Sequence, residues 1–238
     1  MTQLIDLAKT TFDLDLSPQQ GEQFTAYARL LQEWNERINL TTIIEPADIR
    51  IRHFLDSLSI VSVIGFDAGD RLADVGTGAG FPGLPLAIAF PQIEVLLMDS
   101  VKKKIGFLDT VVAELGLQNV STLHIRAEDA GQDPTHRGQY DIVTARAVAL
   151  LPTLLEYLVP LAKVGGFCIA MKGESAAREV DESKRALFVL KAEAKPLAPI
   201  QLPQVDKQHY LVTVEKRENT PAIYPRQAGT PKKKPLGF

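Results

Sequence analysis

The residues best suited to chemistry stand in one glycine-rich stretch, "RLADVGTGAGFPGLPLAIAF", which runs from Arg71 to Phe90. Four glycines fall within residues 76–83, between two apolar runs. Counted from Gly78, the stretch spells G-x-G-x-x-G, the fingerprint of dinucleotide-binding proteins, which would predict an NAD-binding oxidoreductase. Counted from Asp74, it spells a strand-end acid followed by G-x-G-x-G. The two alignments of the same glycines therefore predict different functions.

The alignment that starts at Asp74 fits the chain better. Gly76 and Thr77 separate the apolar run "LADV" from Gly78, whereas a dinucleotide-binding strand leads almost directly into its first glycine. In the other alignment, Gly76, Gly78 and Gly80 follow the run without a gap. Both place the glycines at the carboxyl end of a strand, where ligands bind in an open α/β sheet. An NAD-binding oxidoreductase remains the alternative function.

Acidic residues after two further strands indicate a nucleoside ligand. Asp99 ends the predicted strand "VLLMD", where a carboxylate can accept hydrogen bonds from both ribose hydroxyls. A dehydrogenase would use the same position, so Asp99 predicts a nucleoside without identifying it. In "RAEDA", the Ala127 backbone and Glu128 would lie beside an adenine ring, as in many S-adenosylmethionine sites. Gly78, Asp99, Ala127 and Glu128 are therefore candidate cofactor-binding residues.

Strands and helices alternate along the part of the chain that holds these residues. Apolar runs predict five strands, at 71–75, 93–99, 120–126, 140–146 and 165–173. Helical patterns begin near Gly83 and cover 100–116, 150–162 and 174–190. The alternation implies parallel βαβ units. Two strands at about 191–199 and 208–215 follow with only a loop between them, so we expect an antiparallel pair at the sheet edge. This order favours an α/β fold of the class I S-adenosylmethionine-dependent methyltransferase type, a Rossmann-like sheet.

Three regions are expected along the chain. Residues 1–65 should form an N-terminal helical subdomain, because helical patterns cover 2–13, 17–34 and 46–64. Ser17 and Gln20 should close a capping box at the second of these helices. Residues 66–218 form the methyltransferase core. Residues 219–238 form a basic tail with four cationic and no acidic residues, which we expect to be irregular and packed on or near the core.

The composition excludes several classes of protein. The chain has 238 residues, of which 45% are hydrophobic and 23% are charged, as is typical of a globular protein. No apolar run approaches the roughly 20 residues of a membrane span, and the N-terminus resembles neither a signal nor a transit peptide. One cysteine and four scattered histidines provide no recognisable zinc-binding spacing. We therefore expect a cytoplasmic monomer without a metal or a membrane partner.

Nearly the whole chain resembles the glucose-inhibited division B family. The similarity is carried by "WNERINLTTI", "RHFLDSL", "ADVGTGAGFPGLPLAI", "LLMDSVKKKIGFL", "RAED", "YDIVTARAVA" and "YPRQAGTPKKKPL". Members of this family are bacterial methyltransferases that modify guanine N7 in the 16S ribosomal RNA of the small subunit. The resemblance implies that this chain transfers a methyl group from S-adenosylmethionine to N7 of a specific guanine in that RNA.

The resemblance also assigns cofactor contacts. Carried onto this chain, they fall on Gly76, Phe81, Ala127, Glu128 and Arg146. Arg146 ends the fourth predicted strand, where methyltransferases present catalytic or substrate-facing groups, so it is also the candidate catalytic residue. Guanine N7 is an exposed acceptor that carries no proton, so we expect neither a general base nor a catalytic dyad. In-line attack on a sulfonium methyl group requires mainly positioning.

The net charge of −3 provides no broad positive field, so RNA must be bound by local basic clusters. One place qualifies, the basic tail at 219–238, and further candidates stand on a helix that could flank the cofactor site. The candidate RNA-binding residues are Arg50, Arg52, His53, Arg226, Lys232, Lys233 and Lys234. The expected partner is 16S ribosomal RNA or the small ribosomal subunit. A non-catalytic RNA-binding protein with a methyltransferase fold is the second alternative.

Overall fold

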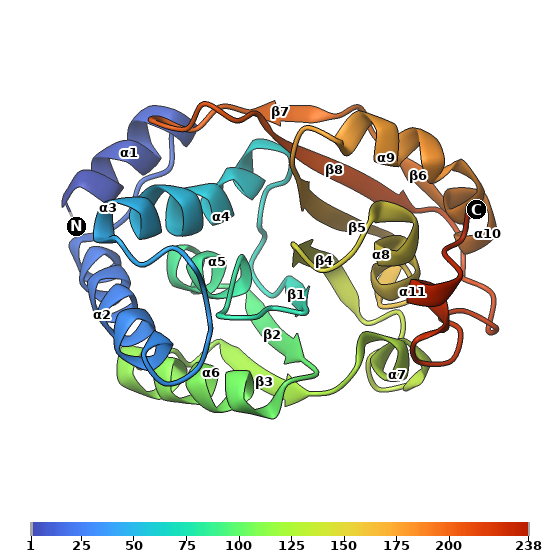
Figure 1. Ribbon diagram of the computed structural model, residues 1–238, viewed down its shortest axis with the longest axis horizontal. Helices are drawn as coiled ribbons and strands as arrows, with labels where there is room; N and C mark the ends of the chain where they lie inside the picture. Colours follow the sequence, from blue (N-terminus) through green and yellow to red (C-terminus); the bar gives the residue numbers. More distant parts are fainter. Residues whose placement is uncertain (1, 238) are drawn as a thin grey trace.

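One sheet of eight strands runs through the protein, whose computed structural model describes residues 2–237 (Figure 1). The strands are β1 (Arg71–Val75), β2 (Glu94–Asp99), β3 (Val120–His124), β4 (Tyr140–Arg146), β5 (Ala162–Lys172), β6 (Ala192–Ala194), β7 (Ala198–Ile200) and β8 (His209–Lys216). Their order is β3-β2-β1-β4-β5-β8-β6, and β7 also pairs with β8. Strands β1 to β5 are parallel, whereas β8 runs antiparallel to its neighbours. The predicted α/β sheet with an antiparallel edge is confirmed.

Helices cover both faces of the sheet (Figure 1). They are α1 (Thr2–Phe12), α2 (Pro18–Asn35), α3 (Pro46–Asp48), α4 (Asp56–Leu58), α5 (Gly83–Ala89), α6 (Lys102–Leu115), α7 (Ala127–Gln132), α8 (Leu151–Leu158), α9 (Ala176–Glu182), α10 (Lys184–Leu190) and α11 (Thr230–Lys233). The predicted capping box of Ser17 and Gln20 begins α2. Within residues 2–237, no helix combines the length and apolar character needed to cross a membrane.

The sheet separates two apolar cores because successive side chains of a strand point to opposite faces. Leu72 of β1 and Ile142 of β4 belong to the core beneath α5, α6 and the N-terminal helices. The next residue of each strand, Ala73 or Val143, belongs to the core beneath α8 and α10. Burial on both faces explains why β1 and β4 read as continuous apolar runs rather than alternating ones.

The N-terminal helices share one core with the sheet. Phe24 and Tyr27 of α2 are fully buried and belong to the same cluster as Leu72. The Tyr27 hydroxyl donates a hydrogen bond to the carbonyl of Ala79 in the glycine-rich loop. The domain boundary at residue 65 stays a prediction, but the helices before it pack directly on the sheet and on the glycine-rich loop.

Three expected elements are less regular than their sequence patterns indicate. The helix expected at 46–64 is a composite: a π-helical segment (Ile49–Leu55) lies between α3 and α4, and a 3₁₀ turn follows. The helix expected at 174–190 breaks at Ser183, whose hydroxyl donates back to the Glu179 carbonyl. Such back-bonding competes with the helical hydrogen bonds. The strand expected at 191–199 is divided into β6 and β7, which pair in turn with β8.

The segment 219–237 folds back on the core. The Arg137 guanidinium donates to the carbonyl oxygens of Gly131, Thr220 and Tyr224 at 2.6–2.8 Å. Leu236 is buried in the core that contains α8. The segment is irregular apart from α11 and packs against the core. The segment is held by Arg137, which stands in a stretch without a recognisable motif. The sequence therefore did not predict this contact.

Candidate active site

The glycine-rich loop after β1 is fixed by the buried carboxylate of Asp74. Its Oδ2 accepts hydrogen bonds from Thr77 Oγ1 at 2.6 Å and from the Gly83 amide at 2.8 Å, which joins the loop to the start of α5. Burial raises the pKa of Asp74 to about 6. Gly76 and Gly78 have φ values of +66° and +64°, a region that non-glycine residues seldom adopt. Asp74 is therefore a loop anchor.

Asp99 ends β2 and is 5% exposed. Its Oδ2 accepts from the Gly78 amide at 3.0 Å, its Oδ1 accepts from the Val101 amide at 2.8 Å, and Lys104 Nζ lies 3.7 Å from Oδ2. A carboxylate has about four acceptor positions, so both oxygens can still accept from ribose hydroxyls. The carboxylate thus holds the glycine-rich loop close to the place where a nucleoside would bind.

A cavity of about 480 Å³ lies beside Asp99. Ala127, Glu128 and Gly76 also line it, together with Gly229 and Lys232 of the C-terminal segment. The structure therefore brings together the residues that the sequence assigned to the adenosine part of a cofactor. We call this cavity the adenosine cavity. Its mixed lining of apolar side chains and a few placed polar groups is typical of cofactor sites.

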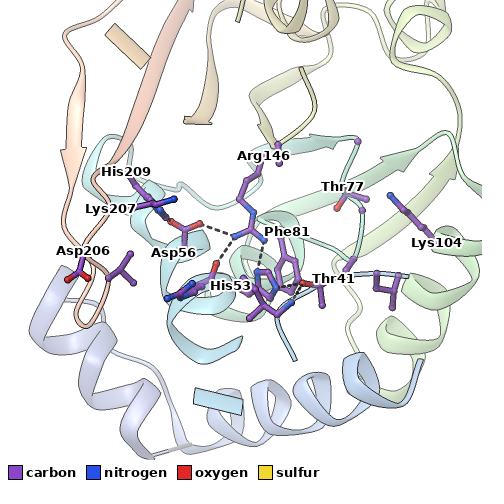
Figure 2. Close-up of a pocket in the computed structure, with 18 residues that line it drawn as sticks. Thr41, His53, Asp56, Thr77, Phe81, Lys104, Arg146, Asp206, Lys207 and His209 are labelled. Atoms are coloured by element: carbon purple, nitrogen blue, oxygen red, sulfur yellow. Dashed lines mark hydrogen bonds and ion pairs between the residues drawn. The ribbon is translucent and has the colours of Figure 1, made fainter. Parts of the chain in front are cut away.

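A second cavity, of about 710 Å³, lies around Arg146 and Phe81 (Figure 2). Gly78, Phe81 and Arg146 line it, and so do His53 and His209. We call it the Arg146 cavity. Gly76 belongs to the walls of both cavities, and a Cβ atom there would lie 2.8 Å from Val148 Cγ2. A side chain at position 76 would therefore collide with Val148, which also lines the adenosine cavity.

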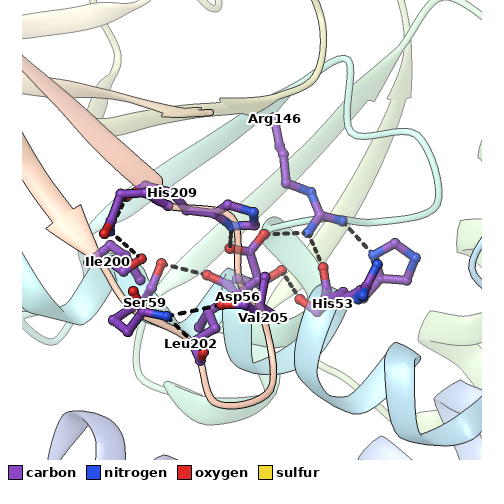
Figure 3. A network of polar contacts seen from close by, with 12 residues as sticks. His53, Asp56, Ser59, Arg146, Ile200, Leu202, Val205 and His209 are labelled. Atoms are coloured by element: carbon purple, nitrogen blue, oxygen red, sulfur yellow. Dashed lines mark hydrogen bonds and ion pairs between the residues drawn. The ribbon is translucent and has the colours of Figure 1, made fainter. Parts of the chain in front are cut away.

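Arg146 is held from several directions at the end of β4 (Figure 3). Its Nη1 donates to Asp56 Oδ2 at 2.9 Å and to the Arg52 carbonyl at 3.1 Å, and its Nη2 donates to His53 Nδ1 at 3.1 Å. The guanidinium carbon lies 4.8 Å from the centre of the Phe81 ring. The second oxygen of Asp56 pairs with His209 Nδ1 at 2.9 Å. The predicted site residues Phe81 and Arg146 are thus in contact.

His53 is 7% exposed, and its ring stacks on Phe81 with centroids 4.4 Å apart. A guanidinium only donates hydrogen bonds, so the Nδ1 that faces Arg146 must be unprotonated. Nε2 lies 2.8 Å from Thr41 Oγ1 and carries the proton. Burial, with the positive charge of Arg146, lowers the pKa of His53 to about 3. His53 is therefore neutral near pH 7, with both nitrogens engaged inside the protein.

This neutral histidine should make the protein less stable in mild acid. In the unfolded chain His53 takes up a proton below about pH 6.5, whereas in the folded chain it stays neutral to about pH 3. The free energy of unfolding of the wild type should therefore fall more between pH 7 and pH 5 than that of His53→Gln, by about 2 kcal/mol at most. Urea unfolding at several pH values measures the difference. Replacing the exposed His124 with Gln should leave the pH dependence of the free energy of unfolding the same as in the wild type. An equal pH dependence in all three proteins would contradict the neutral, buried state of His53.

The candidate RNA-binding residues fall into two groups. Lys232, Lys233 and Lys234 are exposed, and Arg52 is half-exposed in an ion pair with Asp48 at 3.1 Å. The others are more enclosed: Nε of Arg50 is buried without a hydrogen-bond partner among residues 2–237. RNA contact by all of these residues stays a prediction, and the geometry favours it most for the exposed lysines.

Two of the candidate RNA-binding residues, His53 and Arg226, already make hydrogen bonds to other groups of the protein. Nε and Nη2 of Arg226 donate to the two carboxylate oxygens of Glu156 at 2.8 and 2.6 Å. The Glu156 side chain is fully buried. Nη2 also donates to the Lys234 carbonyl. The geometry favours an anchoring role for Arg226 over the predicted contact with RNA, because its charge is already balanced.

Glu128 has an additional role that the sequence did not indicate. Its Oε1 accepts a hydrogen bond from the Gly229 amide at 2.9 Å. Because Gly229 and Lys232 line the adenosine cavity, this contact makes the C-terminal segment part of the cavity wall. The predicted tail is therefore a component of the candidate site.

Comparison with known proteins identifies the family. The family model GidB, described as rRNA small subunit methyltransferase G, matches residues 20–208. A ribosomal RNA small subunit methyltransferase G of Desulfitobacterium hafniense is 51% identical over 97% of this chain and 95% of its own length. The chain belongs to this family. A member from Acetivibrio thermocellus is 46% identical over 94% of the chain and 92% of its own length. The resemblance described from the sequence is confirmed, and with it the assignment to a family of methyltransferases.

Solved structures with little sequence similarity confirm the fold class of this family member. A SAM-dependent methyltransferase from Aquifex aeolicus superimposes with a TM-score of 0.54 at 18% identity, over 71% of this chain and 93% of its own. The YcgJ protein from Bacillus subtilis gives a TM-score of 0.54 at 16% identity, over 70% of this chain and all of its own. The sheet is therefore that of the class I methyltransferases, as predicted.

Sequence reasoning missed two residues of the site, Asp56 and His209. Asp56 stands within "RHFLDSL", three residues after His53, so its place on the same helical turn was an available signal. His209 begins β8, which lies far from Arg146 along the chain. Only the insertion of β8 next to β5 brings it to Asp56. No local pattern predicts such a contact.

Proposed function

We propose that the protein transfers a methyl group from S-adenosylmethionine to N7 of a specific guanine in 16S ribosomal RNA. Membership of the rRNA small subunit methyltransferase G family supports the reaction class and the substrate class. The observation on which the proposal rests most directly is the pair of adjoining cavities. Asp99, Ala127 and Glu128 line one of them, Arg146 lines the other, and Gly76 lies between.

The two cavities suit the two ends of the cofactor. The adenosine cavity offers Asp99 for the ribose hydroxyls and the backbone around Ala127 for adenine. An extended cofactor that passes Gly76 would place its methionyl part in the Arg146 cavity. The methyl group would then lie close to the larger space, where the target base can enter.

The chemistry requires positioning more than proton transfer. Guanine N7 attacks the sulfonium methyl group with its own lone pair, and no proton leaves the nitrogen in that step. The guanine gains the positive charge that the sulfonium loses. Both nitrogens of His53 are engaged by protein groups, which agrees with a reaction without a general base. Holding the two reacting groups in line can itself lower the barrier by about 7–11 kcal/mol.

Cofactor choice separates this proposal from an NAD-binding oxidoreductase. Ligands that bind only the folded protein raise its unfolding temperature. S-adenosylmethionine and its demethylated product should protect the protein from thermal unfolding, whereas NAD should not. Protection by NAD alone would favour the oxidoreductase. Protection by S-adenosylmethionine without methyl transfer to small-subunit RNA would favour the non-catalytic RNA-binding alternative.

Replacing Asp99 with alanine should weaken cofactor binding at least tenfold. The variant loses charge-assisted hydrogen bonds to ribose, each worth about 1.5–3 kcal/mol. It also releases the Gly78 amide from its present acceptor. Titration calorimetry with S-adenosylmethionine measures the change, and circular dichroism checks that the variant stays folded. Asp109→Ala, which removes an exposed acid of α6, is the matched control. Unchanged affinity in Asp99→Ala would remove Asp99 from the site.

The exposed lysines of α11 and its end should bind RNA phosphates. Changing Lys233 and Lys234 together to Gln should weaken RNA binding and reduce its salt dependence by roughly 0.7–0.9 in log–log slope for each lost contact. Cofactor affinity should stay the same. Lys232 is left intact in this variant because it lines the adenosine cavity.

Fluorescence anisotropy with a 16S RNA fragment across a salt series measures the effect of the two lysines. A matched control changes Lys184 and Arg185, two exposed basic residues of α10, to Gln. Parallel salt plots for the wild type and both variants would show that Lys233 and Lys234 are solvated without RNA contact. The RNA surface would then have to include Arg52 or Lys104 at the Arg146 cavity.

A further inference from the structure

Arg146 lies at the end of β4, but the side chains that hold it come from the N-terminal part of the chain. We infer that His53 and Asp56 are positioning residues, which aim the Arg146 guanidinium at the methionyl carboxylate of bound S-adenosylmethionine. The inference rests on the proposed function, and it extends the cofactor site into the π-helical segment and α4.

The guanidinium is fixed by contacts that leave part of it available. A guanidinium has five N–H groups. Asp56, the Arg52 carbonyl and His53 take three of them, two on Nη1 and one on Nη2. The hydrogen bonds within residues 2–237 do not use the remaining Nη2 proton or the Nε proton of Arg146. A carboxylate is the group that two guanidinium N–H bonds recognise best, because the spacing of its oxygens matches the fork.

The position of Arg146 decides which end of the cofactor it meets. Arg146 lines the larger cavity and is not among the residues of the adenosine cavity. The part of the cofactor that extends beyond the adenosine is the methionyl group, and its carboxylate is its only anion. The Phe81 ring lies 4.8 Å from the guanidinium carbon of Arg146. This contact restricts rotation of the guanidinium about the Arg146 side chain.

The surrounding charges favour an added anion. Asp56 balances one positive charge, but it is shared between Arg146 and His209. The hydrogen bond to Asp56 raises the pKa of His209. His53 contributes no charge, so it serves as an acceptor that fixes orientation without adding to the repulsion. Because the single carboxylate of Asp56 is shared between Arg146 and His209, the site has room for a second carboxylate.

The alternative is that Asp56 and His53 only support the fold. The two roles differ in which ligands they affect. A positioning role acts on the carboxylate of the ligand alone, whereas a general loss of structure weakens every ligand of the site. S-adenosylhomocysteine and 5′-methylthioadenosine provide this comparison, because both contain adenosine and a thioether but only the first contains the amino-acid group.

The test is calorimetric titration of the full chain with both ligands, for the wild type and for Asp56→Asn. We expect Asp56→Asn to weaken S-adenosylhomocysteine at least tenfold and to change 5′-methylthioadenosine less than twofold. In an Arg146→Ala background, Asp56→Asn should have no further effect on either ligand. Asp48→Asn, the same substitution at a half-exposed acid that pairs with Arg52, is the control and should change neither affinity.

A second variant keeps the test decisive if Asp56→Asn does not fold. His53→Leu removes the acceptor of Nη2 but leaves Asp56 in place, and it should show the same selective loss. His53→Gln, which retains an acceptor, should recover part of it. Equal weakening of both ligands, or an unchanged preference for S-adenosylhomocysteine, would overturn the positioning role. Failure of the wild type to bind either ligand would instead overturn the proposed function.

Discussion

The Arg146→Ala variant is expected to lose methyl transfer while it stays folded. The substitution removes the guanidinium that lines the Arg146 cavity, and with it the charge-assisted hydrogen bonds that we propose it makes to the cofactor. Two such bonds at about 1.5–3 kcal/mol each correspond to a fall in kcat/KM of roughly 10²–10⁴. Asp56 keeps His209 as a partner, so the loss of folding stability should be smaller than the loss of transition-state stabilisation.

The kinetic pattern of Arg146→Ala separates its possible roles. If Arg146 acts only through cofactor binding, saturating S-adenosylmethionine should restore kcat. If it also contacts the target base, kcat stays low at saturation. Arg146→Lys retains the charge but loses the planar fork, so it should recover little activity. Loss of the native circular dichroism spectrum in Arg146→Ala would show that the residue acts mainly in folding.

The second large effect is expected at Glu156, where α8 holds the C-terminal segment. Glu156 is fully buried and accepts the Arg226 guanidinium through both oxygens and the Arg226 amide through Oε1. Removing one partner of a buried pair typically costs about 3–5 kcal/mol. Glu156→Ala should therefore either lower the free energy of unfolding by about this amount or release the segment. Release would expose residues 219–237 to proteolysis and weaken cofactor binding, since the segment forms part of the adenosine cavity.

A mutant cycle isolates the Glu156–Arg226 pair. Urea unfolding, limited proteolysis and cofactor titration are compared for Glu156→Ala, Arg226→Ala and the double variant. The double variant should be more stable than the sum of the single changes implies, because no unpaired buried charge remains. Additive single and double effects, with a protease-resistant C-terminal segment, would show that the pair does not anchor it.

The sequence predicted the parts of this molecule that are determined locally. Apolar runs that are largely buried revealed β1, β2, β4 and β5, the alternation of strands and helices placed the edge strand β3, and Ser17 with Gln20 marked the start of α2. Gly78 and Asp99 became candidates because strand-end glycines and acids lie where ligands bind in an open α/β sheet, whereas Gly76 was assigned by the family resemblance. These signals lie within a few residues of the feature that they predict.

The remaining features depend on contacts between distant segments. His53 of the π-helical segment (Ile49–Leu55) contacts Arg146, more than 90 residues away in the chain. Arg226 was expected to be a free cation because its partner, Glu156, stands in α8, 70 residues earlier in the chain. Nothing near Asn219 indicates that Arg137 will bind the carbonyls that follow it. Burial of a charge is decided by packing, so its partner cannot be found from local patterns.

The most direct test of the proposed function follows the methyl group into RNA. The purified protein is incubated with S-adenosylmethionine carrying a deuterated methyl group and with small-subunit RNA, free or assembled, from cells that lack this enzyme. The RNA is then digested to nucleosides and analysed by mass spectrometry, with Arg146→Ala as the control. With S-adenosylmethionine well below saturation, we predict deuterated 7-methylguanosine from a single position with the wild type and an initial rate at least a hundredfold lower with the variant. Label in a different nucleoside, or no label in either form of the RNA, would contradict the account.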